Sequence, residues 1–552
     1  MDSANKELAR LFDRIADALE LKGESGFHVL AYRRAARTLD DLAEDVGDLD
    51  RAGRLRELAG IGEGIAKKIH EYLATGRMKK YDSALTDIPP GLFALLDLQG
   101  MGPKTVRLLR ERLGVKDLAT LKAALDSDAV ASLPGMGAKK VDNIRRSIRL
   151  GEMAGERMYL DEAGELASSV IGHVRSAPGA GRVVAAGSLR RGRETVGDID
   201  VLATGDDSSA LVERFTSHPA IEQLVASGPT KASALFRTPG GLRQVDLRVV
   251  KPREFGAALQ YFTGSKDHNV KLRSIAREKG LKVSEYGVFR GRKRVGGATE
   301  EEVYRSVGLP FIEPELREDR GEIEAAREDR LPELVTLDDI RCDLHMHTSR
   351  SDGHDTREAM VEACRARGYT HMAIAEHSVS ASYAGGLSAD QLRRHCDWVD
   401  KCNAKAKRFR ILKAVECDIR LDGTLDYPDA LLARLDLLVA SIHQGFRKNV
   451  TERICAALEH PLVHAIAHPS GRIIGKRPGY DVDLEKVIAR AAEHGRILEI
   501  NSFYGRLDLS DTWARKAKEA GVKLAVNTDA HAVADLDWMQ YGVKTARRAW
   551  LT

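Results

Sequence analysis

The spacing of apolar residues predicts three kinds of region along the chain. In residues 1–150 apolar side chains recur every three or four positions, which predicts helices joined by short turns. The middle of the chain predicts a sheet, from strand-like runs at 182–188, 198–204 and 243–250. From residue 340 onward short apolar runs alternate with amphipathic helical segments, which indicates an α/β unit with a parallel sheet or barrel.

A charged stretch separates the last two regions. Residues 315–334 read ELREDRGEIEAAREDRLPEL and are helix-prone, so we expect a linker or bridging helix and place the main domain boundary there. The chain has 552 residues, which is too long for one hydrophobic core and predicts three or four compact units.

Charge and cysteine content narrow the class of protein. Residues 1–300 hold 49 Lys and Arg against 41 Asp and Glu, whereas residues 301–552 hold 37 against 41, so the first part is the one suited to a phosphate-rich partner. All six cysteines lie at or beyond Cys342 without a CxxC pair, which favours reduced thiols in a cytoplasmic protein. We expect no signal peptide and no membrane span, since no run approaches about 18 apolar residues.

One short pattern occurs three times in the helical region. LAGIGEGIAKKI (58–69), LQGMGPKTVRLL (98–109) and LPGMGAKKVDNI (133–144) each place Gly-x-Gly before an amphipathic helix. The glycines permit a tight turn, and the free N–H groups that open the helix can hold a phosphate without reading a base. A single copy would also fit a plain helical turn, but three resemble helix-hairpin-helix motifs. The expected DNA-binding glycines are Gly60, Gly62, Gly100, Gly102, Gly135 and Gly137.

Three acids in the predicted sheet indicate phosphoryl transfer. Asp198 and Asp200 are two apart on one strand and therefore share a face, and Asp246 lies on another strand. Converging carboxylates need cations between them, and these hard oxygen ligands suit Mg²⁺, or Mn²⁺ in its place. An isolated DxD would more often be a solvated strand end, but here GSLRRG precedes it.

The last third of the chain carries an unusual set of metal-capable residues. Twelve of the 17 histidines lie between His345 and His531, and most of seven successive apolar runs end in a His, Asp or Glu. Residues at the C-terminal ends of parallel strands meet at one end of a barrel. Because one ion needs only three or four protein ligands, nine candidates indicate two or three ions of Zn²⁺, Mn²⁺ or Fe²⁺. The candidates are His345, His347, Asp352, His377, Glu416, His443, His468, Asp529 and His531.

The GS…DxD segment resembles the palm of nucleotidyltransferases of the DNA polymerase beta type, that is, family X. The resemblance implies that Asp198, Asp200 and Asp246 bind the catalytic metals. It further implies a dNTP site in which the triphosphate contacts Gly187, Ser188, Arg191 and Gly197.

The segment YFTGSKDHNVKLRSIAREKG (261–280) resembles the nucleotide-selecting segment of the same family. The resemblance implies that Tyr261, Phe262 and Gly264 lie at the incoming sugar, that Asn269 reaches the minor-groove edge of the base pair, and that Arg273 contacts the template side. Core packing is the alternative for the two aromatic residues. The chain departs from the vertebrate polymerase at Lys266, which replaces an acid, and at Gln244, which replaces a basic residue.

Residues 31–39 and 60–76 resemble the small lyase domain of family X. Lys68 aligns with the Schiff-base lysine, and Tyr32 and Arg56 fall where contacts to a 5′-phosphate are expected. An ordinary exposed helix lysine is the alternative for Lys68.

The motifs DLHMHT, IAEHS, AHPSGR and NTDAH resemble the PHP (polymerase and histidinol phosphatase) domain over residues 340–552. All nine candidate ligand positions are filled, which implies an active domain. In that family the domain is associated with 3′–5′ exonuclease and related 3′-end processing, and we leave cleavage at abasic sites open.

The resemblance implies a multidomain protein with N-terminal all-α helix-hairpin-helix domains, an α+β palm and thumb, and a C-terminal α/β distorted (β/α)7 barrel. We expect these parts: lyase-like 1–85, fingers 86–152, palm 153–250, thumb 251–314, linker 315–338 and PHP 339–552. The expected protein is a cytoplasmic, nucleoid-associated monomer that fills gaps in base excision repair, on gapped or primer-template DNA with dNTPs. The alternatives are a non-templated nucleotidyltransferase fused to a phosphatase, and a non-enzymatic DNA-end scaffold.

Overall fold

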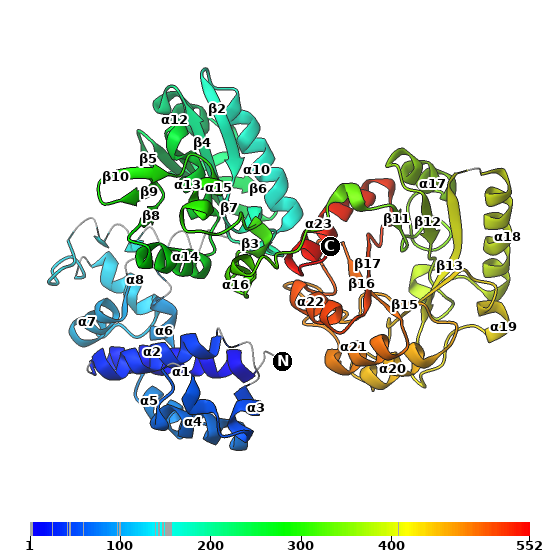
Figure 1. The fold of residues 1–552 in the computed structure, drawn as a ribbon, viewed down its shortest axis with the longest axis horizontal. Helices are drawn as coiled ribbons and strands as arrows, with labels where there is room; N and C mark the ends of the chain where they lie inside the picture. The colour runs from blue at the N-terminus through cyan, green and yellow to red at the C-terminus, as the bar shows by residue number, and fades with distance from the viewer. Residues whose placement is uncertain are drawn as a thin grey trace. The chain divides into compact units, whose positions relative to one another are not determined.

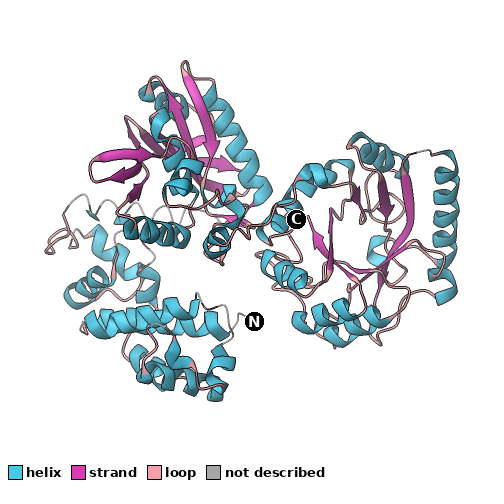
Figure 2. Cartoon of the chain, viewed as in Figure 1, coloured by secondary structure: helices cyan, strands magenta, loops and turns pink. Residues whose placement is uncertain are grey.

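The computed structural model divides the chain into two compact units, Met1–Gly155 and Glu156–Thr552. Figure 1 traces both units, and Figure 2 shows that the first is helical whereas the second contains the sheets. The structure describes residues 4–24, 26–40, 42, 46–58, 60–96, 98, 101–127, 129–137, 140–141, 144–145, 148, 157–406 and 408–552. Gly100 lies outside the described residues.

The first unit consists of helices with short connections, as the helical spacing predicts. The helices are α1 (Ala4–Lys22), α2 (Gly26–Asp40), α3 (Val46–Arg51), η1 (Leu55–Glu57), α4 (Glu63–Thr75), α5 (Lys79–Leu85), α6 (Gly91–Leu95), α7 (Pro103–Leu113) and α8 (Leu118–Asp126). Helices α4 and α7 both end at a glycine in the left-handed conformation, Gly76 and Gly114, which a side chain would disfavour.

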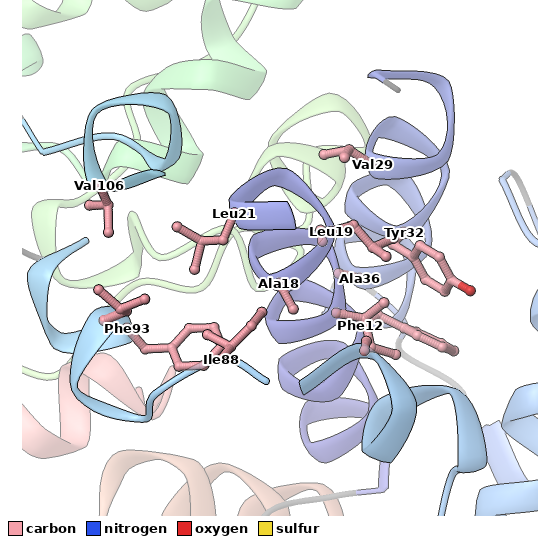
Figure 3. Packing of buried hydrophobic residues seen from close by; sticks show 14 of the residues in the cluster. Phe12, Ala18, Leu19, Leu21, Val29, Tyr32, Ala36, Ile88, Phe93 and Val106 are labelled. Atoms are coloured by element: carbon pink, nitrogen blue, oxygen red, sulfur yellow. The ribbon is translucent and has the colours of Figure 1, made fainter. Parts of the chain in front are cut away.

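The core of this unit forms along one face of α1. Phe12 and Leu19 are fully or almost fully buried there and pack against Tyr32 and Ala36 of α2 (Figure 3). The Phe12 and Tyr32 rings lie 5.8 Å apart, centroid to centroid. This packing places Tyr32, a predicted phosphate-contacting residue, at the edge of the core.

The second unit begins with a five-stranded sheet in the order β2-β4-β7-β6-β5. Strands β4 and β7 are parallel neighbours, and the other pairs are antiparallel. The elements are β1 (Met158–Tyr159), α10 (Leu160–Arg175), β2 (Ala180–Ala185), α11 (Gly187–Arg190), β3 (Thr195–Val196), β4 (Asp198–Gly205), α12 (Ser208–Thr216), β5 (Ile221–Gly228), β6 (Lys231–Thr238) and β7 (Gly241–Val249).

A smaller three-stranded sheet in the order β10-β9-β8 follows with its helices. Its elements are η2 (Pro252–Glu254), α13 (Phe255–Thr263), α14 (Lys266–Glu278), β8 (Lys282–Ser284), β9 (Gly287–Arg290), β10 (Lys293–Gly296) and α15 (Glu300–Ser306). Helix α13 is apolar and mostly buried, and its exit at Gly264 has φ 70°. That turn directs α14 away from α13.

The charged stretch at 315–334 differs from the expected bridging helix. It contains only η3 (Pro314–Leu316) and the six-residue α16 (Glu322–Arg327). Some of its charges are paired inside the fold: Arg317 is fully buried and donates to Glu300 at 2.6 Å, and the Glu322 carboxylate lies 2.6 Å from Nδ1 of His268. Others, at 327–330, are exposed. The sequence alone does not distinguish charged residues that are buried and paired from charged residues on a solvated helix face.

The C-terminal region is a barrel of seven parallel strands that follow one another in chain order, β11 to β17. A parallel bridge between Met346 and Ala530 joins the segments that follow the first and last strands. The strands are β11 (Cys342–Asp343), β12 (His371–Ile374), β13 (Arg410–Asp418), β14 (Leu437–Ser441), β15 (Ala465–Ile466), β16 (Ile497–Asn501) and β17 (Lys523–Asn527).

Helices surround this barrel (Figure 1). They are η4 (Leu337–Asp339), α17 (Arg357–Ala366), η5 (Ser382–Ala384), α18 (Ala389–Lys405), α19 (Asp429–Leu432), α20 (Val450–Glu459), α21 (Leu484–Glu493), α22 (Asp511–Glu519), η6 (Val533–Trp538) and α23 (Met539–Arg548). The barrel and the five-stranded sheet share packing: Leu507 is buried in the sheet's core, and the Tyr159 hydroxyl donates to the Ile474 carbonyl at 2.8 Å.

All six cysteines are free thiols. Among the described residues, no helix is long and apolar enough to cross a membrane.

Candidate catalytic and metal-binding sites

The three predicted acids meet on the parallel strands β4 and β7. Asp200 and Asp246 are direct register partners, and Asp198 lies two residues earlier on β4 with buried Ile199 between. Burial and the nearby carboxylates of Asp198 and Asp246 raise the pKa of Asp200 to about 7. Such mutual repulsion is relieved when cations bind between carboxylates, so this group of acids fits divalent metal ions.

Two neighbours shape this group of acids. The Gln244 side-chain amide donates to both carboxylate oxygens of Asp246, at 3.1 and 3.0 Å. Gly187 has φ 63°, and a Cβ built there would lie 2.4 Å from Oδ2 of Asp200. Gly187 is therefore required both for its left-handed backbone and for the space that Asp200 occupies.

The expected triphosphate residues surround the same strand end. Ser188 is half-buried in α11, and Gly197 is exposed immediately before Asp198. Arg191 donates from Nε to Glu318 at 3.0 Å and from a terminal nitrogen to the Thr263 carbonyl. Its guanidinium is thus held between the end of α13 and the segment that follows the three-stranded sheet.

Sequence reasoning missed the companion arginine. Arg190 donates to the Thr263 hydroxyl at 2.7 Å and to both oxygens of Glu300 at 2.9 and 2.6 Å. The adjacent pair in GSLRRG was the only signal, and it does not reveal a partner 110 residues away.

The predicted nucleotide-selecting residues lie at the junction of α13 and α14. Tyr261 and Phe262 are half-buried with ring centroids 5.2 Å apart, and the Arg248 guanidinium lies 4.7 Å from the Phe262 ring centroid. Asn269 is buried, donates to the Tyr261 carbonyl at 2.7 Å and accepts from Gln260 at 2.7 Å. Asn269 therefore supports the aromatic pair directly.

The outer face of α14 is exposed. Arg273 donates to the Asn269 carbonyl at 3.2 Å, and Lys266 is exposed at the start of the helix. These positions leave both cationic groups available to a ligand.

The three Gly-x-Gly segments share one backbone geometry. In each, the apolar residue between the glycines donates its N–H to the carbonyl three residues earlier, at 3.0 to 3.1 Å, and its side chain is buried. The second glycine then accepts from the first turn of a helix. These central residues are Ile61, Met101 and Met136, and the following glycines Gly62, Gly102 and Gly137 are exposed. Gly60 and Gly135 have φ of 83° and 75°.

Lys68 and Tyr32 lie together in the first unit. The Lys68 ammonium lies 5.9 Å from the Tyr32 ring centroid and donates to the Gly64 carbonyl at 2.8 Å. Partial burial, together with the charge of Lys80, lowers the pKa of Lys68. A lowered pKa provides more of the neutral amine, which is the nucleophilic form. Arg56 is exposed in η1.

The nine candidates of the last third converge inside the barrel. Three groups have potential ligand atoms within 4.8 Å of one another: His347, Asp352, His377 and His531; His345, His347 and Asp529; and His377, Glu416 and His443. His468 joins them, since its Nε2 lies 2.9 Å from Oε1 of Glu416. Most of these residues are buried.

Residues outside the nine candidate ligands orient the histidine rings of the cluster. Nδ1 of His345 lies 2.8 Å from Glu499, and Nδ1 of His443 lies 2.8 Å from Asp418, which leaves Nε2 of both rings for the cluster. Asn501 donates to Asp529 at 3.0 Å. Glu499 and Asn501 both lie on β16, and the sequence did not show their orienting role.

The cluster fits metal ions by its donor chemistry. Nδ1 of His347, Nδ1 of His468 and Oε2 of Glu416 are buried without a hydrogen-bond partner among the described residues. Burial alone would lower the pKa of His377, but Glu416 and Asp352 raise it to about 10. Imidazole and carboxylate ligands in this mixture suit Zn²⁺, Mn²⁺ or Fe²⁺.

The fold and the two sites define the class: a nucleotidyltransferase joined to a metal-dependent phosphoesterase barrel. Models of known families match five stretches, namely a helix-hairpin-helix domain at 3–78, a SAM-like helix-hairpin-helix tandem at 93–150, the DNA polymerase beta palm at 157–234, the DNA polymerase beta thumb at 258–318 and the PHP domain at 343–503. These matches confirm the predicted fold class and imply the use of divalent metal ions.

Similar proteins extend the match to the whole chain. It is 39% identical over 550 residues to the DNA polymerase/3′-5′ exonuclease PolX of Bacillus subtilis (strain 168), over 99% of this chain and 95% of that protein. It is 27% identical over 341 residues to DNA polymerase lambda of Rattus norvegicus, a match that covers 57% of this chain and 56% of that protein. It is 36% identical over 162 residues to a probable phosphatase of Thermoanaerobacter sp. (strain X514), a match that covers 27% of this chain and 63% of that protein. The chain belongs to the PolX family of DNA polymerases.

Proposed function

We propose that the chain is a DNA-directed DNA polymerase that fills short gaps during base excision repair and trims 3′ ends at a second active site. The observation that carries this proposal is the placement of Asp198, Asp200 and Asp246 on adjacent parallel strands. The relative with 39% identity bears the same two activities in its name.

In the polymerase site, the three acids would hold two Mg²⁺ or Mn²⁺ ions, which stabilise the attacking and leaving oxygens of the transferred phosphoryl group. The side-chain amide of Gln244 keeps the Asp246 carboxylate in place. On the nucleotide side, we assign triphosphate contacts to Gly187, Ser188, Arg191 and Gly197.

The sugar and base contacts follow from the α13–α14 junction. We assign Tyr261, Phe262 and Gly264 to the deoxyribose, and Arg273 to the template strand. Asn269 uses one amide hydrogen for the Tyr261 carbonyl. An amide nitrogen has two hydrogens, so the second is available to the minor-groove edge of the base pair.

In the barrel, the nine residues from His345 to His531 would hold two or three Zn²⁺, Mn²⁺ or Fe²⁺ ions, in line with the three overlapping groups of ligand atoms. Such ions supply a nucleophile from water and stabilise the charge on the phosphodiester. Glu499 and Asp418 fix the rings that bind them. We assign 3′–5′ exonuclease activity to this site, and cleavage of abasic DNA as a related reaction.

The first unit would bind DNA and remove a 5′-deoxyribose phosphate. The exposed glycines of the hairpins direct backbone N–H groups outward for phosphates. Lys68 would form the Schiff base, beside phosphate contacts from Tyr32 and Arg56. We further propose that the protein acts as a monomer at the nucleoid in the cytoplasm, on gapped or primer-template DNA.

One labelled gapped duplex tests both sites. Wild-type protein should extend the primer when dNTPs are present and shorten its 3′ end when they are absent, across Mg²⁺, Mn²⁺ and Zn²⁺. Asp200→Asn should lose extension and keep shortening, whereas Glu416→Gln should do the reverse. Nucleotide addition that ignores the template would instead support a non-templated transferase with a phosphatase, and DNA binding without either reaction would support a scaffold.

A further inference from the structure

A pocket of about 410 Å³ on the barrel is lined mainly by basic and aromatic side chains. Arg350 comes from the loop after β11, and Arg357 begins α17. The remaining wall is one face of α18, where Arg394, Trp398 and Lys401 follow one another at helical spacing. Helix α18 packs along β13 on the outside of the barrel (Figure 1).

The pocket has more positive charge than its surroundings neutralise. Among the described residues, no carboxylate forms an ion pair with Arg350, Arg357, Arg394 or Lys401. The nearby carboxylates have other partners: Asp390 pairs with Arg393 at 2.6 Å, Asp397 with Arg434 at 2.9 Å and Asp400 with Lys413 at 3.3 Å, and Glu358 accepts from the Trp398 indole at 3.1 Å. The buried Glu376, whose charge also acts on Arg357, accepts from the Ser351 hydroxyl at 2.5 Å and from the Thr348 N–H at 3.2 Å. Clustered cations without counter-charges form a site for an anion.

Arg357, His395 and Trp398 together form one part of the pocket wall. The Arg357 guanidinium lies 4.1 Å from the Trp398 ring centroid, which fixes its direction. His395, at 2% exposure, lines the pocket and stacks on Trp398, with ring centroids 6.2 Å apart. Burial, and then the charge of Arg350, lowers the pKa of Arg357. The two guanidinium groups therefore lie close enough to repel each other.

The pocket adjoins the metal cluster on two sides. Arg350 is two residues from the ligand candidate Asp352, and the backbone N–H of Leu387, another lining residue, donates to the His377 carbonyl at 2.8 Å. Tyr383 lies in η5, between His377 and Leu387 in the sequence, is 73% exposed, and has its ring centroid 6.4 Å from the His377 ring. An exposed aromatic ring beside a phosphoesterase site offers a stacking surface for an unpaired base.

We propose that this pocket binds the phosphodiester backbone of the single DNA strand whose 3′ end is processed in the barrel, with Tyr383 stacking on the terminal base. This inference rests on the proposed nuclease function. Arg357 and Arg350 hold one phosphate at the base of the pocket, and Arg394 and Lys401 track the strand along α18. The ligand is single-stranded at its end, because stacking on Tyr383 takes an unpaired terminal base.

The test compares two substrates of the full-length protein. A 5′-labelled single-stranded oligonucleotide reaches both the pocket and the cluster, whereas bis(p-nitrophenyl) phosphate reaches only the cluster. Arg394→Gln with Lys401→Gln should raise KM for the oligonucleotide roughly tenfold or more. The slope of log(1/KM) against log salt should become shallower by about 0.7 for each phosphate that the variant no longer binds. The kcat for the oligonucleotide and the rate with the small ester should stay unchanged.

Arg393→Gln is the matched control, because it removes a cation from the adjacent position that is already paired with Asp390. It should behave as wild type. An Arg394/Lys401 variant with wild-type KM and salt slope overturns the proposal, and so does an equal loss of activity on both substrates. A wild-type protein that hydrolyses the small ester but never shortens the oligonucleotide instead contradicts the proposed nuclease function.

Discussion

Arg548, in the last helix of the barrel, donates a hydrogen bond of 2.9 Å to the backbone carbonyl of Arg191, 357 residues earlier in the chain. The same guanidinium donates to Glu318 at 2.9 Å and to Asp511 at 2.8 Å. Glu318 also accepts from Arg191. The barrel therefore holds a residue that we assign to the triphosphate of the incoming nucleotide.

Arg548→Met should weaken nucleotide binding and also lower the free energy of unfolding. The variant keeps an apolar stem but removes one of two arginine partners from each of the half-buried carboxylates of Glu318 and Asp511, at a cost of about 2 kcal/mol. KM for dNTPs should rise because Arg191 loses its support, while barrel nuclease activity remains. Urea denaturation and steady-state primer extension measure the two effects. Arg330→Met, which removes an exposed pair with Glu328, is the control and should change stability by about 0.5 kcal/mol or less. An unchanged dNTP KM in Arg548→Met would limit its role to stability.

Gly187→Ala should remove polymerase activity, whereas Gly280→Ala should not. Both glycines have left-handed backbones, with φ of 63° and 67°, so both variants incur about 1 to 2 kcal/mol of strain. Only at Gly187 would the new Cβ meet Asp200, at 2.4 Å, because the Gly280 position opens onto free space. Displacement of a metal-binding carboxylate should slow extension by about a hundredfold or more. Primer extension alongside thermal unfolding separates the two effects, and equal activity in both variants would refute the explanation.

Removal of metal should make the stability of the protein sensitive to alkaline pH. Burial alone would lower the pKa values of His377 and His443. Glu416 and other carboxylates outweigh it and raise the pKa of His377 to about 10 and that of His443 to about 9. These folded-state values exceed the unfolded value of about 6.5, so the metal-free fold binds extra protons. That stabilisation is complete below about pH 6.5 and disappears as pH rises through 9 to 10. Metal requires unprotonated rings, so its stabilising effect should grow over the same range.

Melting temperatures from about pH 6 to 9.5, in EDTA and in Mn²⁺, check this prediction. The two curves should diverge as pH rises. Glu416→Gln should flatten the EDTA curve, because Glu416 is the leading charge that raises both histidine pKa values. Parallel curves in EDTA and Mn²⁺ would show that these histidines are not where the metal binds.

Local rules were enough to predict which residues would meet. Alternation along a strand placed Asp198 and Asp200 on one face, and the rule that strand ends of a parallel barrel converge grouped residues as distant as His345 and His531. Both rules depend only on backbone periodicity, which the apolar pattern reveals directly.

The partners of buried charges were not predictable in this way. Arg190 with Glu300, Arg317 with Glu300 and His268 with Glu322 join elements whose packing is set by the whole fold. A charged residue has the same appearance in sequence whether it is solvated or paired inside. The stretch at 315–334 was therefore predicted as a linker or bridging helix, although Arg317 and Glu322 within it are buried and paired.

Lys68 and Lys67 provide the sharpest test of the proposed lyase reaction, since they are adjacent but differ in surroundings. Lys67 is exposed and pairs with Glu63 at 2.7 Å. Lys68 is partly buried beside Tyr32, and this burial with the charge of Lys80 lowers its pKa. The neutral amine attacks the sugar aldehyde of an incised abasic site, so Lys68 should form the Schiff base.

Borohydride should therefore trap a covalent adduct between wild-type protein and incised abasic DNA. Lys68→Ala should lose most of the adduct, whereas Lys67→Ala should retain it. Because a lowered pKa supplies free amine at lower pH, wild-type trapping should persist toward neutral pH better than trapping by an ordinary lysine. DNA-binding affinity, measured for both variants by fluorescence anisotropy, controls for weakened binding of the substrate. Equal loss of adduct in the two variants would assign the effect to DNA binding, and an undiminished adduct in Lys68→Ala would assign the chemistry to another amine.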